Sequence, residues 1–485
     1  MITEFYGALN PVVAILLPWL AGSLVVSTLF RGDRVINFFA LTGHGYFAGF
    51  CIVAFITRLA AQHHWPVQAT VYLVMVLIST VSMLYLFVRP ERSNKKSIEF
   101  QLPTIMWEKG VVILIIVVVS YRYTSIFLEM IHLQIFPWDA WMNWAPKALI
   151  WLNTGEFNTF VNPTRWLQEG SPELYTLGNY RAAEYPDFVP LVYFWMMTTA
   201  GADSGLLHLP WLFAPVALGC AIYGHLRLMG VGVAPAVIAF YLFANLPYVN
   251  VHTILAGYAD LWMVSVFSLA VFALHAWETT ANKRWLVTAL FWCAACIWVK
   301  QPGVVFCLIV FISIVRVLLK PKPSIELTAV SAMLLLGAAL VLTSAEFRLP
   351  IIGNILLSTN HITVGALLDQ PIVFYNISYS VLDSLFTSSN WNLVFYLATL
   401  SLALWLASSV STGILSLGFC LITTSLALIF VFSFTPYGDS AIDNVTLNRT
   451  ILYLVPITIV TATLNVWRST KRNTTSSRLK YRNGS

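Results

Sequence analysis

Thirteen long apolar stretches run through the chain, and they limit its fold more than any other feature. An apolar segment of about 20 residues crosses the hydrocarbon core of a bilayer as one α-helix. Only 10% of the residues are charged, whereas soluble domains carry about 25%. The sequence therefore predicts an all-α integral membrane protein with about 13 transmembrane helices. We expect these helices at residues 10–30, 35–60, 68–88, 104–126, 207–227, 231–249, 258–277, 285–299, 301–319, 326–343, 391–408, 411–433 and 450–467.

The positions of Lys and Arg predict the orientation of these helices, because basic residues concentrate in cytoplasmic loops. With the N-terminus outside and the C-terminus inside, 18 of the 27 basic residues fall on the cytoplasmic side. These residues are Arg31, Arg34, Arg89, Arg92, Lys95, Lys96, Arg227, Lys283, Arg284, Arg316, Lys320, Lys322, Arg468, Lys471, Arg472, Arg478, Lys480 and Arg482.

A short apolar segment at residues 186–200 has two prolines near its start. If it crossed the bilayer, every later basic loop would lie outside, against the bias of basic residues toward the cytoplasm. We therefore predict a re-entrant or interfacial helix here. The alternative is a fourteenth crossing, offset by a different assignment near residues 372–390.

This topology divides the chain into four regions. Residues 1–103 form an N-terminal extension of three spans. Residues 104–343 form a core that contains a large outer loop at residues 127–187. Residues 344–390 form a second outer loop, and residues 391–485 hold the last spans and a basic cytoplasmic tail.

Charge, motifs and cysteines disfavour several classes of function. The net charge of +6 is small and lies in short runs, so nucleic-acid binding is not indicated. The sequence contains no GxxxxGK[ST] phosphate loop, so ATP-driven transport by this chain alone is not indicated. Cys293 and Cys296 form a CxxC inside an apolar helical stretch. Redox and zinc motifs need accessible thiolates, so we interpret these and the other four cysteines as packing residues.

Asp139 is the residue of the first outer loop that is best suited to catalysis. It lies in the stretch PWDAWMNWAPK, among Trp138, Trp141 and Trp144. A partly dry aromatic surface favours a carboxylate that accepts protons, and the faces of Trp rings suit sugars. The alternative interpretation is an interfacial belt of Trp residues with an incidental Asp.

Other candidate residues lie in this loop or at the outer ends of apolar stretches. They are Lys147 after the Trp cluster, Asp187 in YPDFVPL, Tyr258 and Asp260 in GYAD, Lys300 in WVKQPG and Arg449 in NRT. An acid at the mouth of a span needs a partner or water, which indicates a substrate-binding role, although helix capping also explains such acids. The cations suit the phosphate of a lipid head group. Snorkelling anchors are the alternative for them.

Together, the WDAW…PKA, YPDFVPL and GYAD motifs and the late Arg followed by LVP resemble the bacterial multi-span GT-C glycosyltransferases. These include mannosyltransferase-like enzymes that act on lipopolysaccharide or protein. The resemblance covers mainly residues 104–305 and 445–456. It implies that Asp139 is the catalytic base, that the donor is a polyprenyl-phosphate sugar, and that the anomeric carbon is inverted. The chain differs from the family in three extra spans before the loop, and it lacks the adjacent Asp-Glu pair of protein O-mannosyltransferases.

The resemblance thus implies a glycosyltransferase in the bacterial inner membrane with its active site facing the periplasm. Its acceptor would be a hydroxyl of a glycan, lipid or protein. A divalent cation is compatible with the family, and no residue is predicted as its ligand. One alternative is a ligase or polymerase of lipid-linked glycans, with Arg348 and His361 in a late key loop. The other is a non-enzymatic transporter or flippase, which would favour paired charges at mid-membrane.

Overall fold

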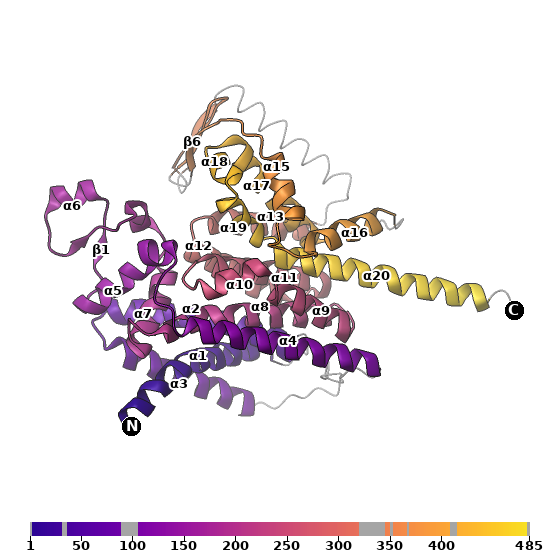
Figure 1. Cartoon of the computed structure of the whole chain (residues 1–485), viewed down its shortest axis with the longest axis horizontal. Helices are drawn as coiled ribbons and strands as arrows, with labels where there is room; N and C mark the ends of the chain where they lie inside the picture. Colours follow the sequence, from indigo (N-terminus) through magenta and orange to yellow (C-terminus); the bar gives the residue numbers. More distant parts are fainter. Residues whose placement is uncertain are drawn as a thin grey trace.

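The fold is mainly helical (Figure 1). The computed structural model describes residues 2–31, 36–88, 105–319, 345–349, 353–365, 368–407 and 415–482. The N-terminal part contains α1 (Ile2–Leu29), α2 (Phe38–Gln62), α3 (Val67–Val88) and α4 (Met106–Met130). The first predicted outer loop contains η1 (Ala140–Trp144), α5 (Ala145–Thr154), β1 (Thr159–Phe160), α6 (Pro163–Glu169), β2 (Leu174–Tyr175) and η2 (Tyr180–Glu184), and α7 (Phe188–Ala200) follows it.

The rest of the chain is also dominated by helices. The core continues with η3 (Gly205–His208), α8 (Leu209–Leu228), α9 (Val233–Ala244), α10 (Pro247–Ile254), α11 (Asp260–Thr280), α12 (Lys283–Val299) and α13 (Gly303–Leu319). Four strands come next: β3 (Ala345–Leu349), β4 (Gly353–Leu357), β5 (His361–Val364) and β6 (Leu368–Pro371). The chain ends with α15 (Ser378–Leu382), η4 (Asp383–Thr387), α16 (Val394–Ala407), α17 (Ser416–Phe434), α18 (Tyr437–Ile442), α19 (Val445–Leu452) and α20 (Val455–Arg482).

Helices coincide with twelve of the thirteen predicted spans, and the predicted span at 326–343 lies outside the described residues. Within the described part of the chain, seven helices are long and apolar enough to cross a bilayer. The count reaches nine if the bent pairs α9–α10 and α19–α20 are each one span. The architecture is therefore that of a multi-pass helical membrane protein, with seven to nine candidate spans among the described residues.

The three N-terminal helices belong to the same bundle as the core, because α2 packs against both α1 and α8. Glycines permit this close approach. A Cβ atom added at Gly22 of α1 would lie 2.0 Å from the carbonyl oxygen of Gly45 in α2. Small residues at helix contacts are the usual means of bringing membrane helices together.

Helix α7 occupies the segment for which we predicted a re-entrant or interfacial helix. It has 13 residues and is buried along nearly its whole length, against α1, α2 and α5. A straight helix of this length covers about 20 Å at 1.5 Å per residue. The hydrocarbon core is about 30 Å thick, so α7 is too short to cross it alone.

Part of the second predicted outer loop is a small sheet, which the all-α prediction did not include. Strands β3, β4, β5 and β6 pair in that order as an antiparallel meander. The turn between β4 and β5 is closed by Ser358, whose hydroxyl accepts a hydrogen bond from the backbone N–H of His361 at 2.9 Å. Strands of four or five residues leave no long apolar pattern in the sequence, which explains why they were missed.

The predicted orientation can be tested with a single cysteine in the turn after α5. Glu156 is exposed there, so a Glu156→Cys variant in a cysteine-free background should react with a membrane-impermeant maleimide from the outer side of intact cells. Lys283→Cys, at an exposed position at the start of α12, is the matched inner control and should react only after permeabilisation. The reverse labelling pattern would invert the proposed topology.

Candidate active site

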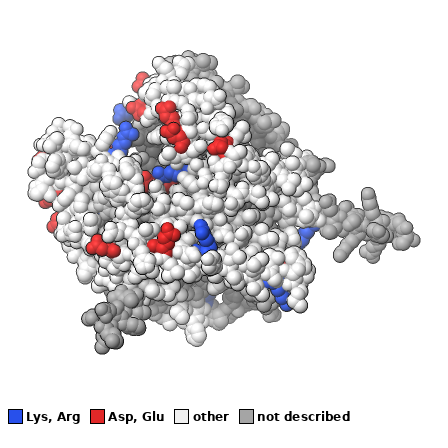
Figure 2. All heavy atoms as spheres, viewed as in Figure 1, with Lys and Arg blue, Asp and Glu red and all other residues white. Residues whose placement is uncertain are grey.

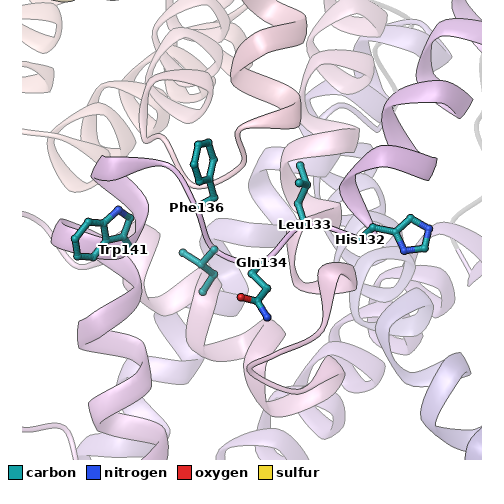
Figure 3. Close-up of a pocket in the computed structure, with 6 residues that line it drawn as sticks. His132, Leu133, Gln134, Phe136 and Trp141 are labelled. Atoms are coloured by element: carbon teal, nitrogen blue, oxygen red, sulfur yellow. The ribbon is translucent and has the colours of Figure 1, made fainter.

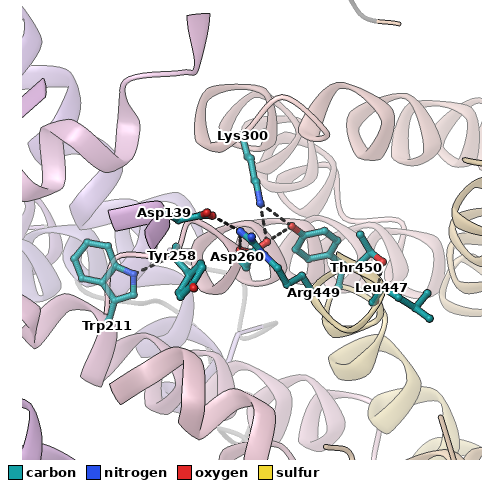
Figure 4. Close-up of polar contacts among 9 residues, drawn as sticks. Asp139, Trp211, Tyr258, Asp260, Lys300, Leu447, Arg449 and Thr450 are labelled. Carbon is teal, nitrogen blue, oxygen red and sulfur yellow. Dashed lines mark hydrogen bonds and ion pairs between the residues drawn. The ribbon is translucent and has the colours of Figure 1, made fainter. Parts of the chain in front are cut away.

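Four predicted residues from distant parts of the chain meet in one cluster (Figure 4). Asp139 lies directly before η1, Asp260 is the first residue of α11, Lys300 follows α12, and Arg449 lies in α19. In Figure 4 the guanidinium of Arg449 lies between the two carboxylates, and Lys300 approaches Asp260 from another side.

The local sequence turns Asp139 inward. Phe136, Trp138 and Trp141 are exposed, whereas the Asp139 residue between them is only 7% exposed. Asp139 is followed by η1, a single π-helical stretch that widens the turn. Such insertions in helices are frequent at functional sites.

Asp260 is held at the start of α11 by a tight preceding turn. Gly257 has φ of +112°, and an added Cβ there would lie 2.1 Å from the hydroxyl of Tyr193. Glycine is therefore required at this turn. The turn is also held by the indole of Trp211, which donates a hydrogen bond to the carbonyl oxygen of Tyr258 at 2.9 Å. Asp260, which follows the turn, is fully buried.

Both oxygens of the Asp260 carboxylate accept hydrogen bonds from cationic groups. Oδ2 accepts from Nε and Nη2 of Arg449, at 3.0 and 2.6 Å. Oδ1 accepts from Nζ of Lys300 at 2.8 Å and from the hydroxyl of Tyr453. Charge-assisted hydrogen bonds of this kind let a carboxylate stay charged without water.

Asp139 has a simpler environment. Its Oδ2 accepts a hydrogen bond from Nη2 of Arg449, which therefore bridges the two carboxylates. Two acids and two cations give the cluster a formal charge of zero. The side chains of Arg449 and Lys300 remain 19% and 20% exposed, so an anion from outside can reach both cations.

Tyr258 lies beside the same guanidinium, whose central carbon is 4.9 Å from the centre of the tyrosine ring. This is a cation–π distance. Burial raises the pKa of the Tyr258 hydroxyl, so it stays protonated. Burial lowers the pKa of Lys300, whereas the neighbouring Asp260 raises it.

Lys147 and Asp187 form a separate ion pair. Nζ of Lys147 lies 3.1 Å from Oδ1 of Asp187 and also donates to the carbonyl oxygens of Ala183 and Tyr185, at 3.3 and 3.0 Å. Oδ2 of Asp187 accepts from Arg58 of α2 at 3.1 Å. An ammonium has three donors, and all three have protein acceptors here. Through Arg58, this pair fastens the predicted outer loop to the bundle, and its geometry does not favour the predicted contact of Lys147 with a phosphate.

The three predicted tryptophans separate into two groups. Trp144 is buried and packs against Tyr185, with ring centres 5.4 Å apart. Trp138 and Trp141 are 53% and 50% exposed. Only these two can therefore offer a ring face to a substrate.

A pocket of about 550 Å³ lies beside this aromatic surface (Figure 3). Five of its lining residues lie between α4 and η1, namely His132, Leu133, Gln134, Ile135 and Phe136, and the sixth, Trp141, belongs to η1. Pockets of this volume suit small-molecule ligands. Figure 2 shows acidic and basic side chains together in a hollow of the surface, on a face that is otherwise mostly uncharged.

Two partners of the predicted residues were not predicted from the sequence. Tyr453 contributes its hydroxyl to Asp260, and Arg58 pairs with Asp187. Tyr453 follows Arg449 by four residues, a spacing that places two side chains on one helix face and could have indicated it. The pairing of Arg58 has no such local pattern.

The residues of the ligase alternative lie elsewhere. Nε2 of His361 is 2.8 Å from Oδ1 of Asp369, and both residues belong to the β3–β6 sheet. Arg348 lies on strand β3. No cluster of three or more His, Cys, Asp or Glu residues in the described part of the chain could hold a metal ion. The divalent cation therefore stays a prediction.

Comparison with known proteins finds no matching family model, curated protein or solved structure.

Proposed function

We propose that this protein is a membrane glycosyltransferase of the GT-C type. It transfers a sugar from a polyprenyl-phosphate donor to an acceptor hydroxyl on the outer side of the membrane. One observation carries the proposal: Asp139, Asp260 and Arg449, taken from three motifs of the resemblance, meet in one partly exposed cluster that also contains Lys300.

The cluster contains the groups that this reaction needs. The acceptor oxygen attacks the anomeric carbon while its proton passes to Asp139. The bond between that carbon and the phosphate oxygen breaks, and the phosphate oxygen keeps the electron pair. Arg449 and Lys300 stabilise the charge that develops on the leaving polyprenyl phosphate. The products are a glycoside of inverted configuration and polyprenyl phosphate.

The exposed tryptophans and the neighbouring pocket are the proposed acceptor surface. Gln134 supplies an amide that can hydrogen-bond a sugar hydroxyl, and Trp141 supplies a ring face. The acceptor would then bind to the same loop that carries the base Asp139.

Trp141→Ala tests this acceptor surface. Loss of ring contact worth about 1.4 kcal/mol should raise KM for the acceptor about tenfold and leave KM for the donor unchanged. Trp107→Ala is the matched control, because Trp107 is 60% exposed at the start of α4 and should change neither constant. Equal KM values for parent and Trp141→Ala would remove Trp141 from the acceptor site.

A radiolabelled sugar-transfer assay in proteoliposomes tests the function itself. Transfer that requires a polyprenyl-phosphate monosaccharide supports the proposal. Transfer only from a lipid-linked glycan chain would indicate the ligase or polymerase instead. Movement of labelled lipid between leaflets without a new glycosidic bond would indicate a flippase.

A further inference from the structure

The hydrogen bonds of Arg449 divide its guanidinium into two edges. The Nε/Nη2 edge is bound to Oδ2 of the fully buried Asp260. The Nη1/Nη2 edge is the other bidentate face that a guanidinium offers to an oxyanion. On that edge, Nη2 already donates to Asp139.

A phosphate that pairs bidentately with Arg449 must therefore replace one carboxylate. Asp260 has four donor contacts, from Arg449 Nε and Nη2, Lys300 and Tyr453. Release of a fully buried carboxylate from its cation is costly. Asp139 has a single contact with Arg449, and its side chain is 10% exposed, against 0% for Asp260, so it is the partner that can leave.

We propose that Arg449 is an exchange point, at which the phosphate of a prenyl phosphate replaces Asp139 and frees that carboxylate. This inference rests on the proposed function and specifies the order in which donor and acceptor bind. Before the donor binds, Asp139 neutralises Arg449. After the donor binds, the phosphate takes that place, and Asp139 is available to accept the proton of the acceptor. Donor binding therefore precedes productive acceptor binding.

If a phosphate replaces Asp139 at Arg449, removal of the negative charge of Asp139 should tighten phosphate binding. In the parent protein the competing carboxylate takes part of the charge-assisted hydrogen bonding that Arg449 could otherwise give to the phosphate. Tritiated farnesyl phosphate should therefore bind the purified Asp139→Asn protein roughly three- to tenfold more tightly than the parent. Glu169→Gln is the matched control: Glu169 is an exposed outer-loop carboxylate paired with Arg165 at 2.6 Å, and its loss should leave the affinity unchanged.

A second measurement separates exchange from a general effect of negative charge. Inorganic phosphate is too small to cover the loop, and it should increase the modification of Asp139 by a water-soluble carbodiimide, followed by mass spectrometry. This follows because coupling between two ligands of one group is reciprocal. Simple occupancy of the site would instead protect Asp139 or leave its labelling unchanged.

The outcomes distinguish this inference from the proposed function. Tighter binding together with increased labelling of Asp139 supports exchange. Equal affinity of parent and variant, or tighter binding without increased labelling, overturns exchange while the glycosyltransferase proposal stands. If neither protein binds farnesyl phosphate, exchange and the proposed lipid-phosphate donor are both wrong.

Discussion

Replacing Arg449 by Ala is expected to reduce sugar transfer by about 10²-fold or more, because loss of one partner of a buried charged pair costs about 2–5 kcal/mol. Arg449 contacts Asp139 and Asp260 and, in the proposed reaction, the phosphate. The loss should appear in KM for the donor and in kcat. Transfer and donor binding are measured on the same purified protein in proteoliposomes.

The same substitution should also destabilise the protein, which the sequence did not predict. Asp260 is fully buried and would keep only Lys300 and Tyr453 as partners. Removal of one partner of a buried ion pair costs about 3–5 kcal/mol, and we expect the lower end because Lys300 remains. Unfolding in a detergent titration measures this cost.

Arg449→Lys is the control that separates charge from shape. It should recover much of the stability, because the positive charge next to Asp260 is retained. It should recover little transfer, because an ammonium cannot pair bidentately with a phosphate. If Arg449→Ala unfolds at the same detergent concentration as the parent and binds donor equally well, Arg449 belongs to neither the ion cluster nor the donor site.

The positions of the membrane helices were predictable because apolar length is a local property of the sequence. The breaks within these helices were harder to predict. Residues 231–249 were predicted as one span, but α9 and α10 meet at an angle of 53°. Pro247 lacks a backbone N–H, and Leu246 before it has extended backbone angles, as the residue before a proline usually has. Pro247 marks the position of the bend in the sequence, whereas the apolar length of the stretch does not reveal it.

The last predicted span contains a similar break. Arg449 was placed just before a span at 450–467, but it lies in the short helix α19, which meets α20 at 48°. This bend carries both Arg449 and Tyr453 to Asp260. An uninterrupted helix would have placed the arginine elsewhere, so the geometry of the site depends on a bend that apolar patterning does not show.

The residues of the site were predictable, but their partners were not. Short motifs selected Asp139, Asp260, Lys300 and Arg449 one at a time. Each had a structural alternative: an incidental Asp in a Trp belt for Asp139, capping for Asp260, and snorkelling for the two cations. The contact between Arg449 and Asp139 joins residues 310 positions apart. Only tertiary packing could bring them together, and the same packing pairs Lys147 with Asp187.

Asp139→Asn is expected to reduce sugar transfer at neutral pH by about 10²–10⁴-fold, the usual contribution of a positioned general base. Asparagine has nearly the same shape as aspartate, and its amide oxygen can still accept from Arg449, so expression and thermal stability should be close to those of the parent. Donor binding should be retained or tightened, which directs the loss to the chemical step. Transfer from a radiolabelled polyprenyl-phosphate sugar in proteoliposomes measures the effect, with Glu169→Gln as an outer-loop control that should transfer at the parent rate.

The opposite result is equally clear. If the purified Asp139→Asn protein retains more than about a tenth of the parent rate, the substitution has raised the activation barrier by less than about 1.4 kcal/mol, and Asp139 is not the base. Asp260 could not replace it as base in its present position, because Arg449, Lys300 and Tyr453 already donate hydrogen bonds to both of its oxygens.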